Sequence, residues 1–139
     1  MLVFVDTGGW IALLKADDHM HERARRHYER RLAEGARFLT TNYVVDETAT
    51  RLRYDADLRA ALAFRAALER SVAERRTRMA WIDPRLEREG WGMLERFADL
   101  PLSLTDATSA AVAGRAKAGE VFGFDAHFRA LGFDVQPVA

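Results

Sequence analysis

The sequence contains no cysteine at all, and this absence narrows the chemistry that the protein can use. Disulfide bonds and thiolate metal ligands are excluded, so any bound metal ion must be held by oxygen or imidazole ligands. Long apolar runs are also missing, and none approaches the roughly 20 residues that a membrane-spanning helix needs. The first residues lack the basic start and the apolar length of a signal peptide. We therefore expect a cytoplasmic protein with no membrane partner.

Net charge is absent too, because 21 basic residues balance 21 acidic ones. No global electrostatic field therefore draws the chain toward nucleic acid. Basic charge is nevertheless dense locally, since residues 21–31 contain five arginines, a residue type suited to two-pronged phosphate contacts. A solvated helix face explains the same cluster without any ligand, and we take that as the default interpretation. The histidines of this stretch, His27 among them, are expected to be solvated as well.

No repeat, low-complexity tract or Pro/Gly/Ser linker divides the 139 residues, so we expect a single domain over residues 1–139. Short apolar runs predict strands at Leu2–Val5, Arg37–Thr40, Met79–Ile82, Glu120–Gly123 and Phe133–Gln136. Helical periodicity predicts helices at Gly9–Lys15, His19–Ala33, Tyr43–Tyr54, Leu58–Glu74, Arg85–Phe97 and Thr105–Lys117. Alternation of this kind implies right-handed crossovers. The predicted fold class is a three-layer α/β domain with a central, mostly parallel five-stranded sheet flanked by helices.

Carboxylates stand where the predicted strands end. Asp6 follows the first strand, Asp125 follows the fourth, and Asp106 lies where an extended piece becomes a helix. Glu47 lies in the first two turns of the helix after the second strand. Because open parallel sheets bind ligands beyond the carboxyl ends of their strands, all four map to the binding edge. Simpler explanations exist for each alone, since aspartate is a preferred helix N-cap and Glu47 is spaced to pair with Arg51.

Clustered carboxylates repel one another unless a cation neutralises them. Oxygen ligands of this kind suit Mg²⁺ or Mn²⁺, and such a site supports phosphodiester hydrolysis. Periodicity does not choose between Asp46 and Glu47 as the ligand on their helix. If Val45, Ala49 and Leu52 form the stripe that faces the core, Glu47 points about 200° away from Val45 at about 100° per residue.

Four segments, in order, resemble the motifs of PIN domains, especially the VapC-type toxins of bacterial and archaeal toxin–antitoxin pairs. They are Val3–Leu13, Thr41–Thr48, Leu102–Ala107 and Gly123–Phe128, and the resemblance covers nearly the whole chain. It implies a PIN-like fold and a Mg²⁺- or Mn²⁺-dependent endoribonuclease, with tRNA or rRNA as the expected substrate. It also implies a homodimer and a cognate antitoxin protein that neutralises the acidic cleft.

Carried over to this sequence, the resemblance makes four carboxylates catalytic and metal-binding: Asp6, Glu47, Asp106 and Asp125. The glutamate of the second motif falls on Glu47, which makes Asp46 the weaker choice. Thr7 and Thr105 would supply hydroxyls that support a metal-bound water or a carboxylate. The sequence departs from many relatives at Gly8-Gly9, where a serine or threonine often stands, and this removes one supporting hydroxyl.

Two other functions remain open at this level. A non-toxin PIN-like RNA-processing or RNA-binding module would share the fold, but a non-catalytic one is expected to have lost some of the acidic residues. A metal-dependent phosphatase would use the same acidic edge. The chain lacks the lysine and the nucleophile-flanking pattern of an aspartyl-phosphate enzyme, and turnover of a small phosphate ester without RNA cleavage would favour that class.

Overall fold

Five parallel strands form one sheet in the order β3-β2-β1-β4-β5. The computed structural model describes residues 1–138. The strands are β1 (Leu2–Val5), β2 (Arg37–Thr41), β3 (Thr77–Ala80), β4 (Glu120–Phe122) and β5 (Val135–Gln136). The helices are α1 (Thr7–Leu14), α2 (His21–Ala33), α3 (Asn42–Asp55), α4 (Leu58–Ala73), α5 (Pro84–Arg96), α6 (Leu104–Arg115) and α7 (Ala126–Ala130). The predicted fold class is confirmed, and the sheet is parallel throughout.

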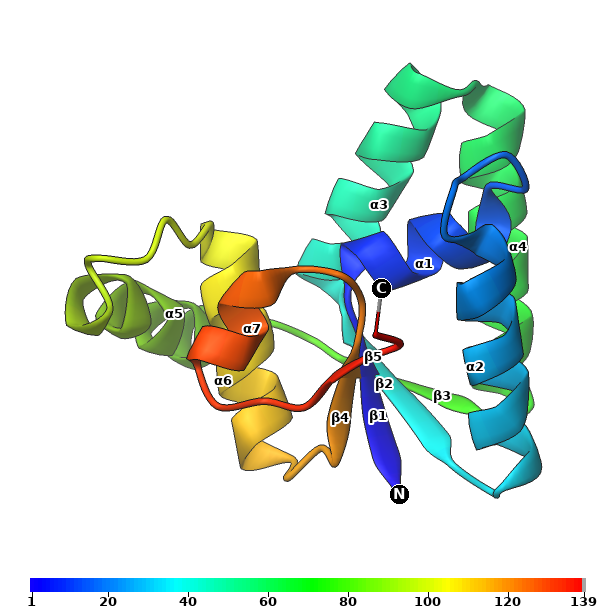
Figure 1. Cartoon of the computed structure of the whole chain (residues 1–139). Coiled ribbons are helices and arrows are strands. Elements are labelled where there is room, and N and C mark those ends of the chain that lie inside the picture. The colour runs from blue at the N-terminus through cyan, green and yellow to red at the C-terminus, as the bar shows by residue number, and fades with distance from the viewer. Residues whose placement is uncertain (139) are drawn as a thin grey trace.

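The helices cover both faces of the sheet. Figure 1 shows α2 and α4 on one side and α5, α6 and α7 on the other, while α3 extends beyond the carboxyl ends of the strands. This follows from right-handed crossovers, because the chain moves from β1 toward β3 on one face and returns to β4 on the other. In the part of the chain that is described, no helix is long and apolar enough to cross a membrane.

The central strands are buried on both faces, which explains their uninterrupted apolar sequences. Val3, Phe4 and Val5 of β1 have no exposed surface, and neither have Val121 and Phe122 of β4. Each fully buried side chain of this size stabilises the fold by about 1.5–3 kcal/mol. The first and fourth strands therefore form a rigid base for whatever follows their carboxyl ends.

The third strand begins two residues earlier than the apolar run predicts. Thr77 starts it, because its backbone pairs with Phe38 and its buried hydroxyl lies 2.6 Å from the Ser71 hydroxyl. The predicted strand also extends too far at its other end, because β3 ends at Ala80. The amide of Ile82 instead donates a hydrogen bond to the Asn42 side chain at 2.6 Å. Local polar partners, which hydrophobicity does not report, therefore set both limits of this strand.

The first helix also begins earlier than predicted, at Thr7, and runs close against β4. A Cβ atom at Gly9 would lie 2.5 Å from the Phe122 carbonyl oxygen, a distance that real Cβ atoms do not tolerate. Gly8 has ordinary space, because its nearest neighbours would be 3.8 Å away. Gly9 is therefore required for the approach of α1 to β4, whereas Gly8 is not.

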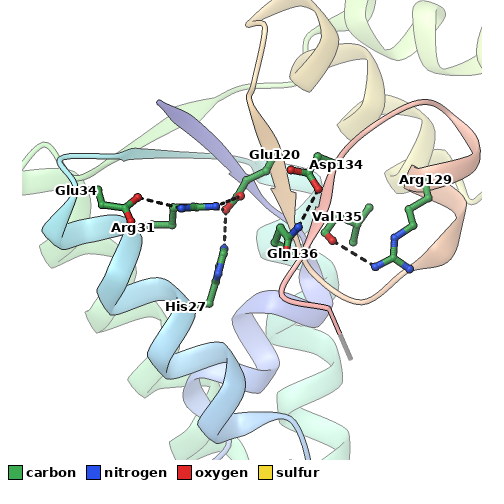
Figure 2. Close-up of polar contacts among 8 residues, drawn as sticks. All are labelled: His27, Arg31, Glu34, Glu120, Arg129, Asp134, Val135 and Gln136. Carbon is green, nitrogen blue, oxygen red and sulfur yellow. Dashed lines mark hydrogen bonds and ion pairs between the residues drawn. The ribbon is translucent and has the colours of Figure 1, made fainter.

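A buried ion-pair network fastens α2 to β4, and it corrects the expectation that His27 is solvated. Glu120, the first residue of β4, is fully buried and accepts hydrogen bonds from Arg31 at 3.1 and 2.9 Å. His27 Nε2 lies 2.7 Å from the same carboxylate and is 3% exposed (Figure 2). Burial alone would raise the pKa of Glu120, but the hydrogen bonds from Arg31 and His27 outweigh it and lower this pKa.

Candidate active site

Asp6 is placed at the carboxyl end of β1 with its side chain buried. The residue is 5% exposed, and within residues 1–138 its Oδ1 atom has no hydrogen-bond partner. Asp6 occupies the N-cap position of α1, yet its side chain makes no capping hydrogen bond. Gly123, just after β4, packs against it, since a Cβ there would lie 3.2 Å from the Asp6 Cβ. Capping therefore does not account for this aspartate.

The electrostatics of Asp6 show that the predicted carboxylates influence one another. Burial raises the pKa of Asp6 to about 7, and a hydrogen bond from the Thr7 backbone opposes this increase. The negative charges of Asp106, Glu47 and Asp125 raise the pKa further. Like charges affect a pKa in this way only over short distances in a site of low dielectric. The four acidic residues therefore form one electrostatic site at the carboxyl edge of the sheet.

The tightest group in this site consists of Asp106, Asp125 and His127. One ligand atom from each lies within 4.8 Å of the others, and all three side chains are partly buried. Asp125 is the N-cap of α7, where its Oδ1 accepts a hydrogen bond from the His127 amide at 2.8 Å. The His127 Nδ1 atom lies 3.1 Å from the same oxygen. His127 was not among the predicted site residues, and its position two residues after a strand-end aspartate is the signal that identifies it.

Asp106 has a structural role as well as a place in this group. It is the third residue of α6 and forms a capping box with Ser103. Its Oδ2 accepts from the Ser103 amide at 3.0 Å, while its own amide donates to the Ser103 hydroxyl at 3.0 Å. Its Oδ1 makes no hydrogen bond to the described part of the chain. The capping interpretation is therefore correct for one oxygen and leaves the other available.

The position of Glu47 follows from the buried stripe of α3. This stripe begins at Val44, one residue earlier than the pattern of the sequence predicts. Val44, Thr48 and Leu52 are the buried residues, so Val45 does not lead the stripe. Glu47, three residues after Val44, lies on the flank of this stripe and is partly buried. Asp46 is exposed, and no ion pair joins Glu47 to Arg51 in residues 1–138. Burial therefore favours Glu47 over its neighbour.

The two predicted supporting threonines differ in their surroundings. Thr7 is 2% exposed, and its hydroxyl has no partner among the described residues. Thr105 is partly exposed, and its backbone carbonyl accepts a hydrogen bond from the Thr108 hydroxyl. Thr48 and Ser109 are further buried residues whose hydroxyls have no partner in the described chain. Because buried hydroxyls are normally hydrogen-bonded, the Thr7 hydroxyl next to Asp6 is free to donate to a ligand or a water at this site.

The donor set fits a hard divalent cation. It offers carboxylate oxygens and an imidazole, and it contains a buried carboxylate oxygen without a partner at Asp6. Mg²⁺ and Mn²⁺ prefer such oxygen ligands and retain several waters instead of requiring a closed protein cage. A cation would also remove the repulsion that raises the pKa of Asp6. The residues that could hold it are Asp6, Glu47, Asp106 and Asp125.

Several known proteins are similar to this chain in sequence and in fold. The PIN domain family matches residues 3–134. The 23S rRNA-specific endonuclease VapC20 of two Mycobacterium tuberculosis strains is 34% identical over 137 residues, which is 98% of this chain and 99% of that protein. The crystal structure of M. tuberculosis VapC20, described as a sarcin-ricin loop cleaving toxin, has a TM-score of 0.84 and covers 94% of this chain and 95% of its own.

More distant structures share the fold alone. VapBC2 from Rickettsia felis, bound to a promoter DNA fragment, has a TM-score of 0.68 at 12% identity, over 98% of both chains. VapBC-1 from nontypeable Haemophilus influenzae has a TM-score of 0.63 at 14% identity, over 98% of this chain and 97% of that one. The family match and the full-length likeness to VapC20 confirm the resemblance seen in the four motifs. The chain belongs to the PIN-domain family and is a homologue of VapC-type toxin endonucleases.

Proposed function

We propose that this protein is a Mg²⁺- or Mn²⁺-dependent endoribonuclease toxin that cleaves 23S ribosomal RNA. The observation that carries the chemistry is the buried, unpartnered carboxylate of Asp6, which shares one electrostatic site with three other acidic residues. The substrate is inferred from VapC20, because 34% identity extends over 98% of this chain. Both lines of support point to phosphodiester hydrolysis at the carboxyl edge of the sheet.

Neighbouring residues of the chain hold the acidic side chains of the site in position. When bound, the cation neutralises phosphate charge, activates a water and stabilises the leaving oxygen. Ser103 orients Asp106 through the capping box, and the His127 amide fixes Asp125 at the start of α7. The burial of Asp6 on the rigid end of β1 excludes water from one side of the site and strengthens electrostatic interactions there. The acidic ligands are therefore oriented before the substrate arrives.

The partners are inferred from family membership alone. We propose a homodimer and a cognate antitoxin protein whose segment covers the acidic edge, and we expect the protein to act in the cytoplasm. Co-purification of the chain with the product of a neighbouring gene, and loss of RNA cleavage in that complex, would test the antitoxin.

The nuclease proposal is tested by incubating the pure protein with ribosomal RNA and Mg²⁺ or Mn²⁺. We expect cleavage at one defined position, and its loss in EDTA and in the Asp6→Asn and Asp106→Asn variants. Asp46→Asn is the matched control, because this exposed acid is adjacent to Glu47 but outside the predicted ligand set. Equal cleavage by the wild type and Asp6→Asn would reveal a contaminating nuclease and overturn the proposal.

A further inference from the structure

The arginines of α2 fall into two groups that differ in their partners. Arg25 forms ion pairs with two glutamates of its own helix, and Arg31 pairs with the buried Glu120 and with another glutamate. Arg23, Arg26 and Arg30 are exposed, and none has a carboxylate partner within residues 1–138. The charges of these last three are therefore not neutralised by a carboxylate of the described chain.

The three unpaired arginines line one hollow, which we call the arginine hollow. Their spacing of three and four residues places them on one face of α2, in a row about 10 Å long at a rise of about 1.5 Å per residue. The hollow has a volume of about 360 Å³ and lies between α2 and the segment that follows β5. It is lined by Arg23, Arg26, His27, Arg30, Gln136, Pro137 and Val138. Figure 2 labels two of these lining residues, His27 on α2 and Gln136 on β5.

The arginine hollow is held rigidly against the sheet. His27 forms part of its lining and is bound to Glu120 on β4 at 2.7 Å. At its mouth, Arg23 donates a hydrogen bond to the Val138 carbonyl at 2.9 Å. Because α2 is fastened to β4 by the buried network, the arginine row has a fixed position relative to the carboxyl edge of the sheet. The helix therefore needs no rearrangement of its backbone when a ligand binds, which lowers the cost of binding.

A second hollow is lined by segments that adjoin the carboxylates in the chain and by the residues just before α2, and we call it the connecting hollow. Its volume is about 380 Å³. Two of its lining residues adjoin the acidic site in the chain, since Gly8 lies two residues after Asp6 and Phe124 directly precedes Asp125. A third, Met20, is the N-cap of α2. The connecting hollow is therefore lined both by segments next to the carboxylates in the chain and by the residue that precedes the arginine-bearing helix.

The connecting hollow has a chemistry of its own. Arg51 and His19 lie at its border, and Arg51 has no carboxylate partner in the described chain. Phe124 and Ile11 supply apolar surface beside the Arg51 guanidinium. Aromatic and cationic side chains placed together are typical of surfaces that bind single-stranded RNA, where bases stack and phosphates pair. The hollow is also lined by one carboxylate, Asp18, which accepts a hydrogen bond from the Met20 amide at 2.8 Å.

We propose that the arginine hollow binds backbone phosphates of the RNA on one side of the cleaved bond, with the connecting hollow holding the intervening nucleotide. This inference rests on the proposed nuclease function. Guanidinium groups bind phosphate oxygens in a two-pronged geometry, and these three lack competing carboxylates within the described chain. An acidic protein segment would also fit the charge. RNA is favoured because the arginine hollow adjoins the acidic edge: the carbonyl of Gln136, which lines it, accepts a hydrogen bond from the amide of Gly123, and Gly123 packs against Asp6.

The test measures RNA binding separately from cleavage. A fluorescein-labelled RNA hairpin with the sarcin-ricin loop sequence is titrated by anisotropy with the Asp106→Asn protein, with and without Arg23→Gln, Arg26→Gln and Arg30→Gln. We expect about tenfold weaker binding and a salt-dependence slope reduced by about 2, since each lost phosphate contact lowers it by about 0.7. In the cleavage-competent protein the same triple change raises KM and leaves kcat unchanged. Arg25→Gln is the matched control on the same helix and changes neither quantity.

The outcomes separate the two proposals. If the wild type neither cleaves nor binds RNA, the proposed function fails. If it cleaves RNA but the triple variant binds with unchanged affinity and salt slope, the arginine hollow has another occupant and this inference is overturned. An equal loss in Arg25→Gln also overturns it, because the effect would then reflect overall charge. Should the triple variant not fold, Arg26→Gln alone is measured, and about twofold weaker binding is expected.

Discussion

Replacement of Asp6 by asparagine should stabilise the metal-free protein at alkaline pH, although it removes a predicted catalytic residue. Burial raises the pKa of this carboxyl from 3.8 to about 7. Between these two values the folded chain holds a proton that the unfolded chain has released, so stability falls as the pH rises. The destabilisation is absent below pH 3.8 and complete above about pH 7. Asparagine carries no charge and removes this pH dependence.

The expected magnitude follows from the difference between the two pKa values. A change from 3.8 to about 7 corresponds to about 4 kcal/mol, at about 1.4 kcal/mol for each pH unit. Screening by solvent reduces this little, because Asp6 is only 5% exposed. Domains of this size are typically stable by about 5–15 kcal/mol, so the ionised carboxylate removes a large fraction of the total. Asparagine removes this cost, so the difference between the two proteins should be measurable at pH 8.

The assay is urea unfolding in EDTA at pH 5 and at pH 8. We expect the advantage of Asp6→Asn over the wild type to be about 3 kcal/mol larger at pH 8 than at pH 5, while exposed Asp46→Asn shows no such trend. Addition of Mg²⁺ at pH 8 should raise the stability of the wild type but not that of Asp6→Asn. An Asp6→Asn variant that gains nothing at pH 8 would refute the burial argument and, with it, the electrostatic case for a cation.

Two further changes test the packing and the buried network. Gly9→Ala should cost about 2 kcal/mol, because the new Cβ would lie 2.5 Å from the Phe122 carbonyl oxygen. Gly8→Ala, which has ordinary space, is its control, and equal urea midpoints for the two variants would contradict the close approach of α1 to β4. Glu120→Gln should cost about 3 kcal/mol near neutral pH, because Arg31 would keep a partly buried charge without its partner. The lowered pKa of Glu120 means that its contribution is lost as the pH falls through that pKa, so unfolding curves of variant and wild type should converge in acid.

Much of the fold was predictable because strands and helices alternate along the chain. Buried parallel strands leave continuous apolar runs, and helices of moderate length between them permit right-handed crossovers. The start of β3 was missed because Thr77 is polar in sequence, and its burial depends on a hydroxyl partner at Ser71. Likewise, the position of His27 on a charged helix gives no sign of Glu120, which lies 93 residues away. Contacts between distant polar residues have no periodic signature.

The candidate site was predictable to the extent that it depends on strand ends. Asp6 follows β1 directly and Asp125 lies three residues after β4, and neighbouring parallel strands bring their carboxyl ends together. The choice of Glu47 over Asp46 needed the family resemblance, because the sequence pattern predicts a buried stripe that begins at Val45, whereas the stripe in α3 begins at Val44. His127 was missed because its place depends on the turn that Asp125 caps.

The capping box at Asp106 has a consequence for how this residue is conserved in evolution. Its carboxylate closes the first turn of α6 and also faces Asp125 and His127, so a change at this position weakens a helix as well as a site. Selection for a stable fold alone would tend to keep this residue, even in a lineage that had abandoned catalysis. Asp6 has no such protection, because its carboxylate caps nothing and destabilises the protein when it is ionised. Across relatives, the persistence of Asp6 is therefore a better record of retained activity than the persistence of Asp106.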